Sequence, residues 1–447
     1  MAATIQLSRN THVYIGQISG GAEKLWKIPV LDGFSFSQST ATTEVGLNEM
    51  QSTNGVSQRG RSMFTDALEP AEWSFSTYAR PGKESNLHTA VEEVLWAMFL
   101  GADTWNDTTD AWTRATPAGS LITGASSGRA TNATLDCSIS NVAELGTFNL
   151  YFVLGGCAPG ADEAHFCSFN GQTVYKLDGC VVNTAGIDFD IDGITTINWS
   201  GFGSKIQQIG YKTTDPGTTN YNPVTGANPE GNFDASDASN RLGHASTSST
   251  TNFLRNRIAS LQVVPDKDSD FTGSNFELTD RDQGTDPPGG SDADEDSTTG
   301  DEFLKEYNLT LTGGSINFEN NITFLTPEEL CRVNTPIGHI TGTRTISGSF
   351  TCYLNDDDGD LSDDTGKSGK FFFDLSRATN LTQNKFFVKF DIGNVAAGPG
   401  MTVKFPMCHI DIPAHSIEDI ISLETNFHAL PTSLTSADDF SIVYKGA

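Results

Sequence analysis

An internal repeat constrains the fold of this chain more than any other feature. Residues 173–201 align without a gap with residues 401–429, at a constant separation of 228 positions. The identical positions are Lys176 and Lys404, Cys180 and Cys408, and Asn198 and Asn426. Asp190 meets Glu418, and Trp199 meets Phe427. Three identities in one window carry little weight alone, so the interpretation depends on whether the rest of each half repeats in the same order.

Four other segments of the first half find partners in the second half in the same order. The pairs are 7–18 with 254–264, 25–36 with 306–318, 75–78 with 350–353, and 147–156 with 385–394. Their separations are 246, 281, 275 and 238 positions, as expected when loops differ in length. The period is far too long for a solenoid, so the pattern predicts two copies of one domain.

The local patterns predict a mainly β protein with one helix beside each sheet. Residues 72–78 alternate apolar and polar, as a half-buried strand does. Residues 87–100 place their apolar side chains on one helical face and stop at Gly101, and 371–378 is the shorter counterpart. Further strands are expected at 148–154, 175–182, 186–191 and 195–200, whereas the polar stretch 40–60 is expected to be a long loop between strands.

The expected domain boundaries follow the repeat. The first domain is 1–202, and the second is 253–447. Between them, 203–252 is rich in Thr, Ser, Asn and Gly and reads as a linker or surface insertion. The acidic segment 280–302 interrupts the second domain and is expected to be disordered.

Composition excludes several classes of protein. The net charge is -29 with only 19% charged residues, so the chain repels nucleic acid phosphates at long range. An acidic wall can still guide DNA through a channel without holding it, although acidity for solubility alone is an equally good explanation. The N-terminal residues predict no secretory signal, and no apolar run approaches a membrane span. Seven cysteines without a CxxC pair are expected to be reduced thiols in a cytosolic product.

The sequence predicts no catalytic site, no metal site and no cofactor. The acidic segment 354–366 fails the calcium-loop register, because Gly359 at the sixth position would place Leu354 at the first. His409 and His415, with Cys408, lack the second ligand pair that would complete a tetrahedral site. No GxSxG, HExxH, GxGxxG or GxxxxGK[ST] motif occurs.

The polar loop supplies the candidate residues for contacts between chains. Arg59 and Arg61 are notable in a chain so poor in basic residues, and acidic side chains lie on the same loop. The alternative is a loop tip in water, where such ion pairs contribute little. The candidates are Glu44, Asn48, Glu49, Gln58, Arg59 and Arg61.

Several motifs resemble the major tail tube proteins of tailed bacteriophages. They are IPVLDGFSFSQST (28–40), RGRSMFTDALEPAEWSFSTYARP (59–81), RNRIASLQVV (255–264), LTGGSINFENNITFLTPEEL (311–330) and TGTRTISGSFTCYL (341–354). The resemblance implies tandem β-sandwich or half-barrel domains, each with a flanking α-helix, that assemble into a closed β-barrel ring. It also implies that the long loop 36–63, with its shorter counterpart 322–341, meets the next ring.

The resemblance further implies a structural subunit of the virion tail, made in the host bacterial cytoplasm. Because the chain is duplicated, trimers with pseudo-sixfold symmetry are favoured over hexamers. The rings would stack into a channel for DNA ejection. The implied partners are a tape-measure protein, baseplate or tail-tip proteins, a tail terminator and a sheath, with DNA passing unbound and no membrane contact. The alternatives are a carbohydrate-binding or glycan-degrading β protein, and a capsid or decoration protein.

Overall fold

The structure is a computed structural model of the whole chain. It describes the following residues: 11–19, 22–45, 62–84, 87–106, 111–115, 117–122, 129–137, 140, 142–154, 173–190, 193–209, 252–256, 260–265, 307–326, 334–355, 368–377, 385–417 and 420–446.

The described residues form an almost entirely antiparallel β structure with two short helices. The helices are α1 (Glu93–Phe99) and α2 (Ser368–Arg377). The strands of the first half are β1 (His12–Ser19), β2 (Ala22–Ile28), β3 (Ser35–Ser37), β4 (Thr40–Val45), β5 (Ser62–Leu68), β6 (Ala71–Tyr78), β7 (Pro81–Glu84), β8 (Leu87–Ala90), β9 (Thr104–Asn106), β10 (Ala111–Ala115), β11 (Ala118–Ile122), β12 (Ala133–Asp136), β13 (Phe148–Leu154), β14 (Thr173–Asp190), β15 (Thr196–Gly203) and β16 (Lys205–Ile209). Those of the second half are β17 (Ser260–Pro265), β18 (Tyr307–Leu309), β19 (Leu311–Glu319), β20 (Thr323–Leu325), β21 (Gly338–Ile340), β22 (Thr345–Tyr353), β23 (Phe386–Gly393), β24 (Gly400–Ile410), β25 (Ala414–Ile417), β26 (Ile421–Leu430) and β27 (Ser441–Lys445).

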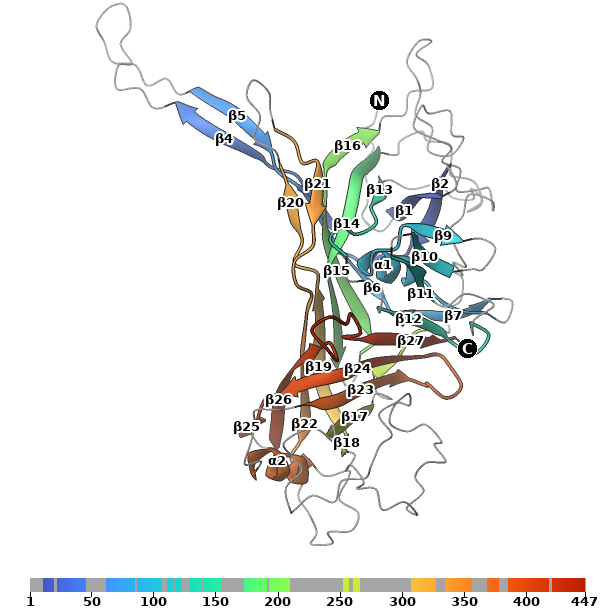
Figure 1. Cartoon of the computed structure of the whole chain (residues 1–447), viewed down its shortest axis with the longest axis vertical. Helices are drawn as coiled ribbons and strands as arrows, with labels where there is room; N and C mark the ends of the chain where they lie inside the picture. Colours follow the sequence, from blue (N-terminus) through green and yellow to red (C-terminus); the bar gives the residue numbers. More distant parts are fainter. Residues whose placement is uncertain are drawn as a thin grey trace, which may run out of the picture.

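A continuous run of strands forms the spine of the molecule (Figure 1). Pairing follows the order β3–β6–β15–β14–β19–β22–β26–β25, so each half supplies four strands. The helix α1 and the strands β9 to β12 lie on one side of this spine, and the hairpin β4–β5 projects away from the body. The mainly β class predicted from the sequence is confirmed, and among the described residues β3 and β25 each pair on one side only.

The two halves share one strand order. In the first half β2 pairs with β1, β1 with β13, β13 with β14, β14 with β15, β15 with β6, and β6 with β3. In the second half the same path runs through β18, β17, β23, β24, then β26, β22 and β19. The last strands also correspond, because β16 pairs with the first part of β14 as β27 pairs with the first part of β24.

Strand register repeats as well as strand order. Phe148 lies opposite Cys180 and Leu150 opposite Leu177, with a register shift between Phe148 and Leu150. In the second half Phe386 lies opposite Cys408 and Val388 opposite Phe405, with the shift at the same place. Both pairings reproduce the separations of 238 and 228 positions read from the sequence.

One sequence equivalence is off by two residues. Trp199 lies opposite Phe75, whereas Phe350, the counterpart of Phe75, lies opposite Thr425. Trp199 therefore corresponds to Thr425 and not to Phe427. A shift of two residues keeps the alternation of faces, so the side chains of Trp199, Thr425 and Phe427 are all buried on the core face.

Strand pairs and hydrogen bonds join the two halves. Strand β14 pairs with β19 over Thr184–Asp190, and β27 lies beside β12 through Ala133–Asp136. The side-chain amide of Asn320 donates to the carbonyl oxygens of Phe99 (3.0 Å) and Val182 (3.2 Å). One main hydrophobic core spans both halves, with members from Val13 to Tyr444.

Aromatic side chains dominate this core around α1. Every residue of α1 is buried, and Trp96 packs against Trp199 and Phe318 with ring centroids 4.9 and 5.3 Å apart. The indole N–H of Trp96 donates to the hydroxyl of Tyr444 at 2.8 Å. The helix of the first half thereby contacts the last strand of the second half. Neither described helix is long and apolar enough to span a bilayer.

Three local predictions need correction. Residues 87–90 form β8, paired with β7, and the helix begins only at Glu93. Residues 40–45 form β4, paired with β5, where a loop was expected. The segments 175–182 and 186–191 belong to one long strand, β14, whose break is a register shift near Asn183. The insertions 203–252 and 280–302 lie outside the described residues, apart from the ends of the first.

Candidate assembly surfaces

One face of the spine is polar, and its described residues include His428, opposite Ser347, but no Lys or Arg. Along each strand, residues on the opposite face enter the core, as the alternating burial of β6 shows. The exposed face carries Ser, Thr and Asn together with carboxylates. Those carboxylates are Glu72, Asp188, Asp190, Glu319 and Glu424. Among the described residues that point to this face, none is Lys or Arg.

Hydrogen bonds order this polar face across the strands. Ser76 donates to Asn198 at 2.6 Å, and Asn198 donates to Asp188 at 2.6 Å. Thr184 and Ser200 are 2.6 Å apart, and Ser315 and Ser349 are 3.4 Å apart. Hydroxyl, amide and carboxylate groups therefore predominate on this face, although Tyr78, Phe202 and Tyr353 also lie on it.

The hairpin β4–β5 is the projecting arm of the molecule (Figure 1). It exposes two large apolar side chains, Met63 and Phe64, on β5. Such side chains on an extended hairpin suit contact with another molecule. Of the predicted contact residues, Glu44 lies on β4 opposite Met63 and is exposed. Asn48, Glu49, Gln58, Arg59 and Arg61 lie outside the described residues, so their contacts stay a prediction.

The counterpart segment of the second half lies beside the base of this arm. Strands β20 and β21 form a short hairpin, with Phe324 opposite His339. Asn334 accepts a hydrogen bond from the N–H of Leu68 (2.7 Å) and donates to the carbonyl of Asp66 (3.1 Å). The second predicted stacking segment, 322–341, therefore contacts the base of the hairpin just after the first predicted segment, 36–63.

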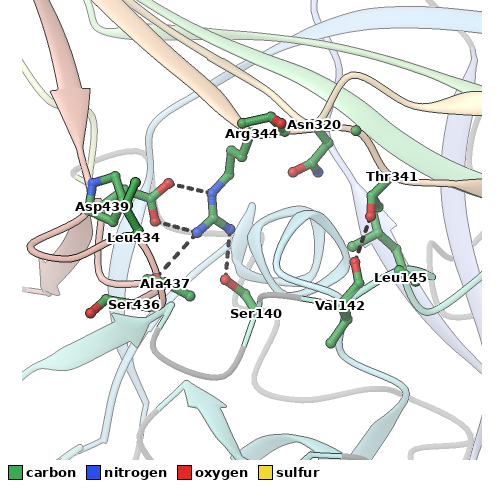
Figure 2. A pocket seen from close by; sticks show the side chains of 14 residues that line it. Ser140, Val142, Leu145, Asn320, Thr341, Arg344, Leu434, Ser436, Ala437 and Asp439 are labelled. Carbon is green, nitrogen blue, oxygen red and sulfur yellow. Dashed lines mark hydrogen bonds and ion pairs between the residues drawn. The ribbon is translucent and has the colours of Figure 1, made fainter.

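A cavity of about 610 Å³ lies at the seam between the halves (Figure 2). Its walls come from the segment after β12, the ends of β19 and β21, and the loop before β27. Thr341 donates to the carbonyl of Val142 at 2.6 Å, and Leu145 donates its N–H to His339 at 2.9 Å. Burial lowers the pKa of His339, which favours the neutral imidazole that accepts this bond.

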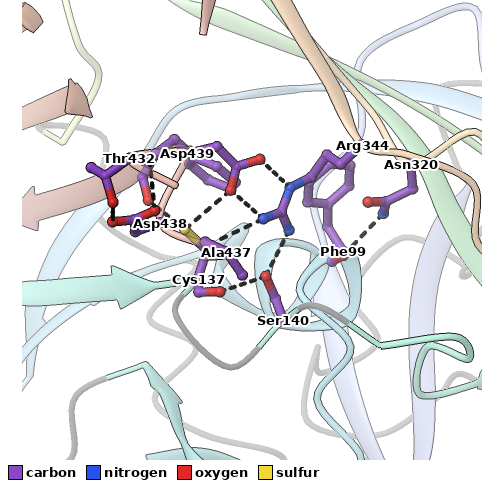
Figure 3. Close-up of polar contacts among 10 residues, drawn as sticks. Phe99, Cys137, Ser140, Asn320, Arg344, Thr432, Ala437, Asp438 and Asp439 are labelled. Carbon is purple, nitrogen blue, oxygen red and sulfur yellow. Dashed lines mark hydrogen bonds and ion pairs between the residues drawn. The ribbon is translucent and has the colours of Figure 1, made fainter. Parts of the chain in front are cut away.

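The charged groups of this cavity bind each other. Arg344 donates from Nε to Asp439 at 2.7 Å, from Nη1 to Ser140 at 2.7 Å, and from Nη2 to the carbonyl of Ala437 at 3.3 Å (Figure 3). Its guanidinium also lies over the Phe440 ring, and Ser140 donates to the carbonyl of Cys137. We interpret this cluster as a clasp between the halves, since its hydrogen-bonding capacity is used internally.

Two adjacent carboxylates are buried at the start of α1. Glu93 forms an ion pair with Arg129 at 2.7 Å, and it accepts from the indole of Trp112 at 3.1 Å. Glu92 accepts from the backbone N–H of Arg80 at 3.1 Å and bonds to Tyr444. Burial raises the pKa of Glu92 to about 7, against its ordinary 4.5. Reasoning from the sequence missed this pair, because its partners are distant in the chain.

The residues tested for metal binding are not brought together. His409 lies 3.7 Å from Asp411, while the His415 ring packs on Phe372. Cys408 is buried, and this burial raises the pKa of its thiol well above the ordinary value. Among the described residues there is no group of three or more His, Cys, Asp or Glu placed to hold a metal ion.

A comparison with known proteins finds similarity to a phage tail tube protein. No family model matches the chain. The tail tube protein pb6 of Escherichia phage T5 is 24% identical over 448 residues, which span 98% of this chain and 75% of that protein. The predicted resemblance to phage tail tube proteins is confirmed. The similarity to a tail tube protein likewise supports the predicted place in the virion tail.

One solved structure overlaps the chain only weakly. It is the sheath/tube terminator of the PVC extracellular contractile injection system in its extended state, with 9% identity and a TM-score of 0.25. The overlap covers 46% of this chain and 99% of the terminator. At that score it supports no inference about the tube-like fold.

Proposed function

We propose that the chain is a structural subunit of a phage tail tube, in which closed rings stack around a channel that DNA crosses during ejection. The observation that carries the proposal is the sheet β3–β6–β15–β14–β19–β22–β26–β25, which repeats one four-strand unit twice and ends in open edges. Ring closure would remove such edges, which otherwise invite aggregation. Similarity to a tail tube protein supports the same function.

The repeat supports two tandem domains, 1–202 and 253–447, separated by the polar insertion 203–252. We favour a ring of three chains, whose six repeats would give pseudo-sixfold symmetry. A head-to-tail interface generates a ring when its rotation closes.

The polar face of the spine is the best candidate for the channel wall. Five carboxylates without Lys or Arg on the described part of this face would repel DNA phosphates and leave no site for adhesion. The projecting hairpin β4–β5 would contact the next ring. Tape-measure, tail-tip, terminator and sheath proteins remain predicted partners, and a non-catalytic role agrees with the structural relative.

Electron microscopy of the purified protein, alone and with a nucleating tail-tip complex, tests the proposal. We expect rings or tubes with a central channel and three chains per ring. A chain that stays monomeric under all assembly conditions contradicts the proposal. Sixfold rings of whole chains would contradict the trimer while keeping the tube.

A further inference from the structure

The junction between β14 and β19 is a contact between the two repeats that the chain makes with itself. Seven residue pairs join the strands, from Thr184 opposite Glu319 to Asp190 opposite Gly313. Strand β14 is the last strand of the first four-strand unit, and β19 is the first strand of the second. The molecule therefore contains one example of how a unit joins the next.

The corresponding strands at the two ends of the spine are open. Strand β25 holds the position in the second unit that the end of β14 holds in the first, and it pairs only with β26 among the described residues. Strand β3 corresponds to β19, and within the described part of the chain it pairs only with β6. Figure 1 shows β25 and β26 at the lower end of the spine.

We propose that β25 of one chain pairs antiparallel with β3 of a second copy, in the register of the β14–β19 junction. The proposal rests on the tube function, and it names the surface by which chains join within a ring. The partner is a second copy of the same chain, because the internal β14–β19 junction already shows the geometry of such a contact.

Strand pairing fixes the register. Trp73 corresponds to Gly348, and these residues lie opposite Phe36 and Ile316, so β3 and β19 correspond at a separation of 280 positions. The sequence alignment gave 281, which would exchange the two faces of β3. Strands β14 and β25 correspond at a separation of 228 positions. Applying both separations to the β14–β19 register predicts four pairs between chains. They are Ala414 with Ser37, His415 with Phe36, Ser416 with Ser35, and Ile417 with Phe34. Each pair joins residues of one face, as antiparallel strands require.

Burial at equivalent positions supports this pairing. Phe189 in the internal junction is 5% exposed, and its ring packs 5.6 Å from that of Phe390. Its equivalent, Ile417, is 78% exposed. Ile421, opposite Ile417, and its neighbour Ile420 are also exposed, at 38 and 60%. An apolar cluster of this kind at a strand end is typical of an interface.

The receiving surface is apolar as well. Phe34 and Phe36 stack on Phe152, with ring centroids 5.5 and 4.6 Å apart. Phe152 is the equivalent of Phe390, which contacts Phe189 in the internal junction. The large and the small side chain change places between the internal junction and the proposed contact between chains. Phe189 lies over Gly314, where a Cβ would approach its ring to 2.7 Å, whereas the smaller Ile417 would lie against the larger Phe34.

Cysteine cross-linking between chains tests the register. In a background with Cys157, Cys167 and Cys331 replaced by Ser, we would mix one chain carrying Ser35→Cys with another carrying Ser416→Cys. Ser37→Cys with Ala414→Cys forms a second predicted pair. The matched controls exchange the partners, Ser37→Cys with Ser416→Cys and Ser35→Cys with Ala414→Cys, and correspond to slips of two residues.

We expect the two predicted pairs to form disulfide-linked dimers at least fivefold faster than the exchanged pairs. Ile417→Asp should give a monomer with an unchanged melting temperature, because the side chain is exposed before assembly, while Ile417→Leu should still assemble. Rings that link equally well in the exchanged register, or that tolerate Ile417→Asp, overturn the proposed contact and leave the tube function standing. A chain that forms no oligomer at all overturns both.

Discussion

Glu92 makes the stability of this fold depend on pH in the direction opposite to most carboxylates. Its side chain is fully buried, and its pKa is raised from 4.5 to about 7 by burial, which outweighs its hydrogen bonds and the nearby Arg80. The folded chain therefore binds a proton at pH values where the unfolded chain has released it. Stability must fall as pH rises from about 4.5 to about 7, and it stays reduced above that range.

The size of this effect follows from the pKa. Each unit by which the pKa differs between the folded and unfolded chain corresponds to about 1.4 kcal/mol. Ionised Glu92 therefore costs about 3 kcal/mol of folding free energy above pH 7. Glu92→Gln is neutral at every pH and still accepts from Arg80. We expect the variant to match the wild type near pH 4.5 and to be more stable by about 2 to 3 kcal/mol at pH 8.

Denaturant unfolding of the unassembled chain between pH 4.5 and 8 measures the free energy of unfolding of the wild type and of Glu92→Gln. Glu72→Gln, an exposed carboxylate on the polar face, is the matched control and should leave the pH dependence unchanged. A Glu92→Gln variant that keeps the wild-type dependence on pH would refute the reasoning. A variant that is destabilised equally at both ends of the range would do the same, since it would indicate that the hydrogen bonds dominate.

Two other predictions concern the seam and the channel. Arg344→Met leaves Asp439 without its partner in a mostly buried position, and denaturant unfolding should show a loss of about 3 kcal/mol, partly recovered in Arg344→Met with Asp439→Asn. Equal loss in the single and double variants would argue against a clasp. Asp188→Lys with Asp190→Lys places cations on the proposed channel wall, and assembled tubes should then retain short duplex DNA at low salt and release it as salt rises. Asp188→Asn with Asp190→Asn should retain little, and equal retention by both variants would argue that this face does not line the channel.

The sequence predicted the parts of the fold that repeat. The hairpin of β13 and β14 and that of β23 and β24 share a register shift at the same place, and the cysteines Cys180 and Cys408 mark it in both copies. Alternation identified β6 because its core-facing side chains are large and apolar. These repeated pairings are the part of the strand order that the residues alone indicated.

Contacts between distant segments left no such signal. Strand β12 pairs with β27, and Ala133 lies opposite Tyr444, although nothing in either segment identifies the other. The hairpin strand β4 is polar and mostly exposed, so it has no apolar period and was taken for a loop. Residues 87–90 carry a helical pattern, but they form β8 because they pair with β7 and because His88 donates its N–H to the carbonyl of Arg129.

In the proposed ring, the two contacts that each repeat makes would be unequal. The β14–β19 contact forms within one chain, at the high effective concentration that a covalent link provides, and it extends over seven residue pairs. The proposed contact between chains must form at ordinary concentration from two short edges, β3 with three residues and β25 with four. Short edges are poor templates for unintended pairing, which protects a soluble subunit from aggregation. In the proposed ring, the contact between chains would therefore be the weaker of the two.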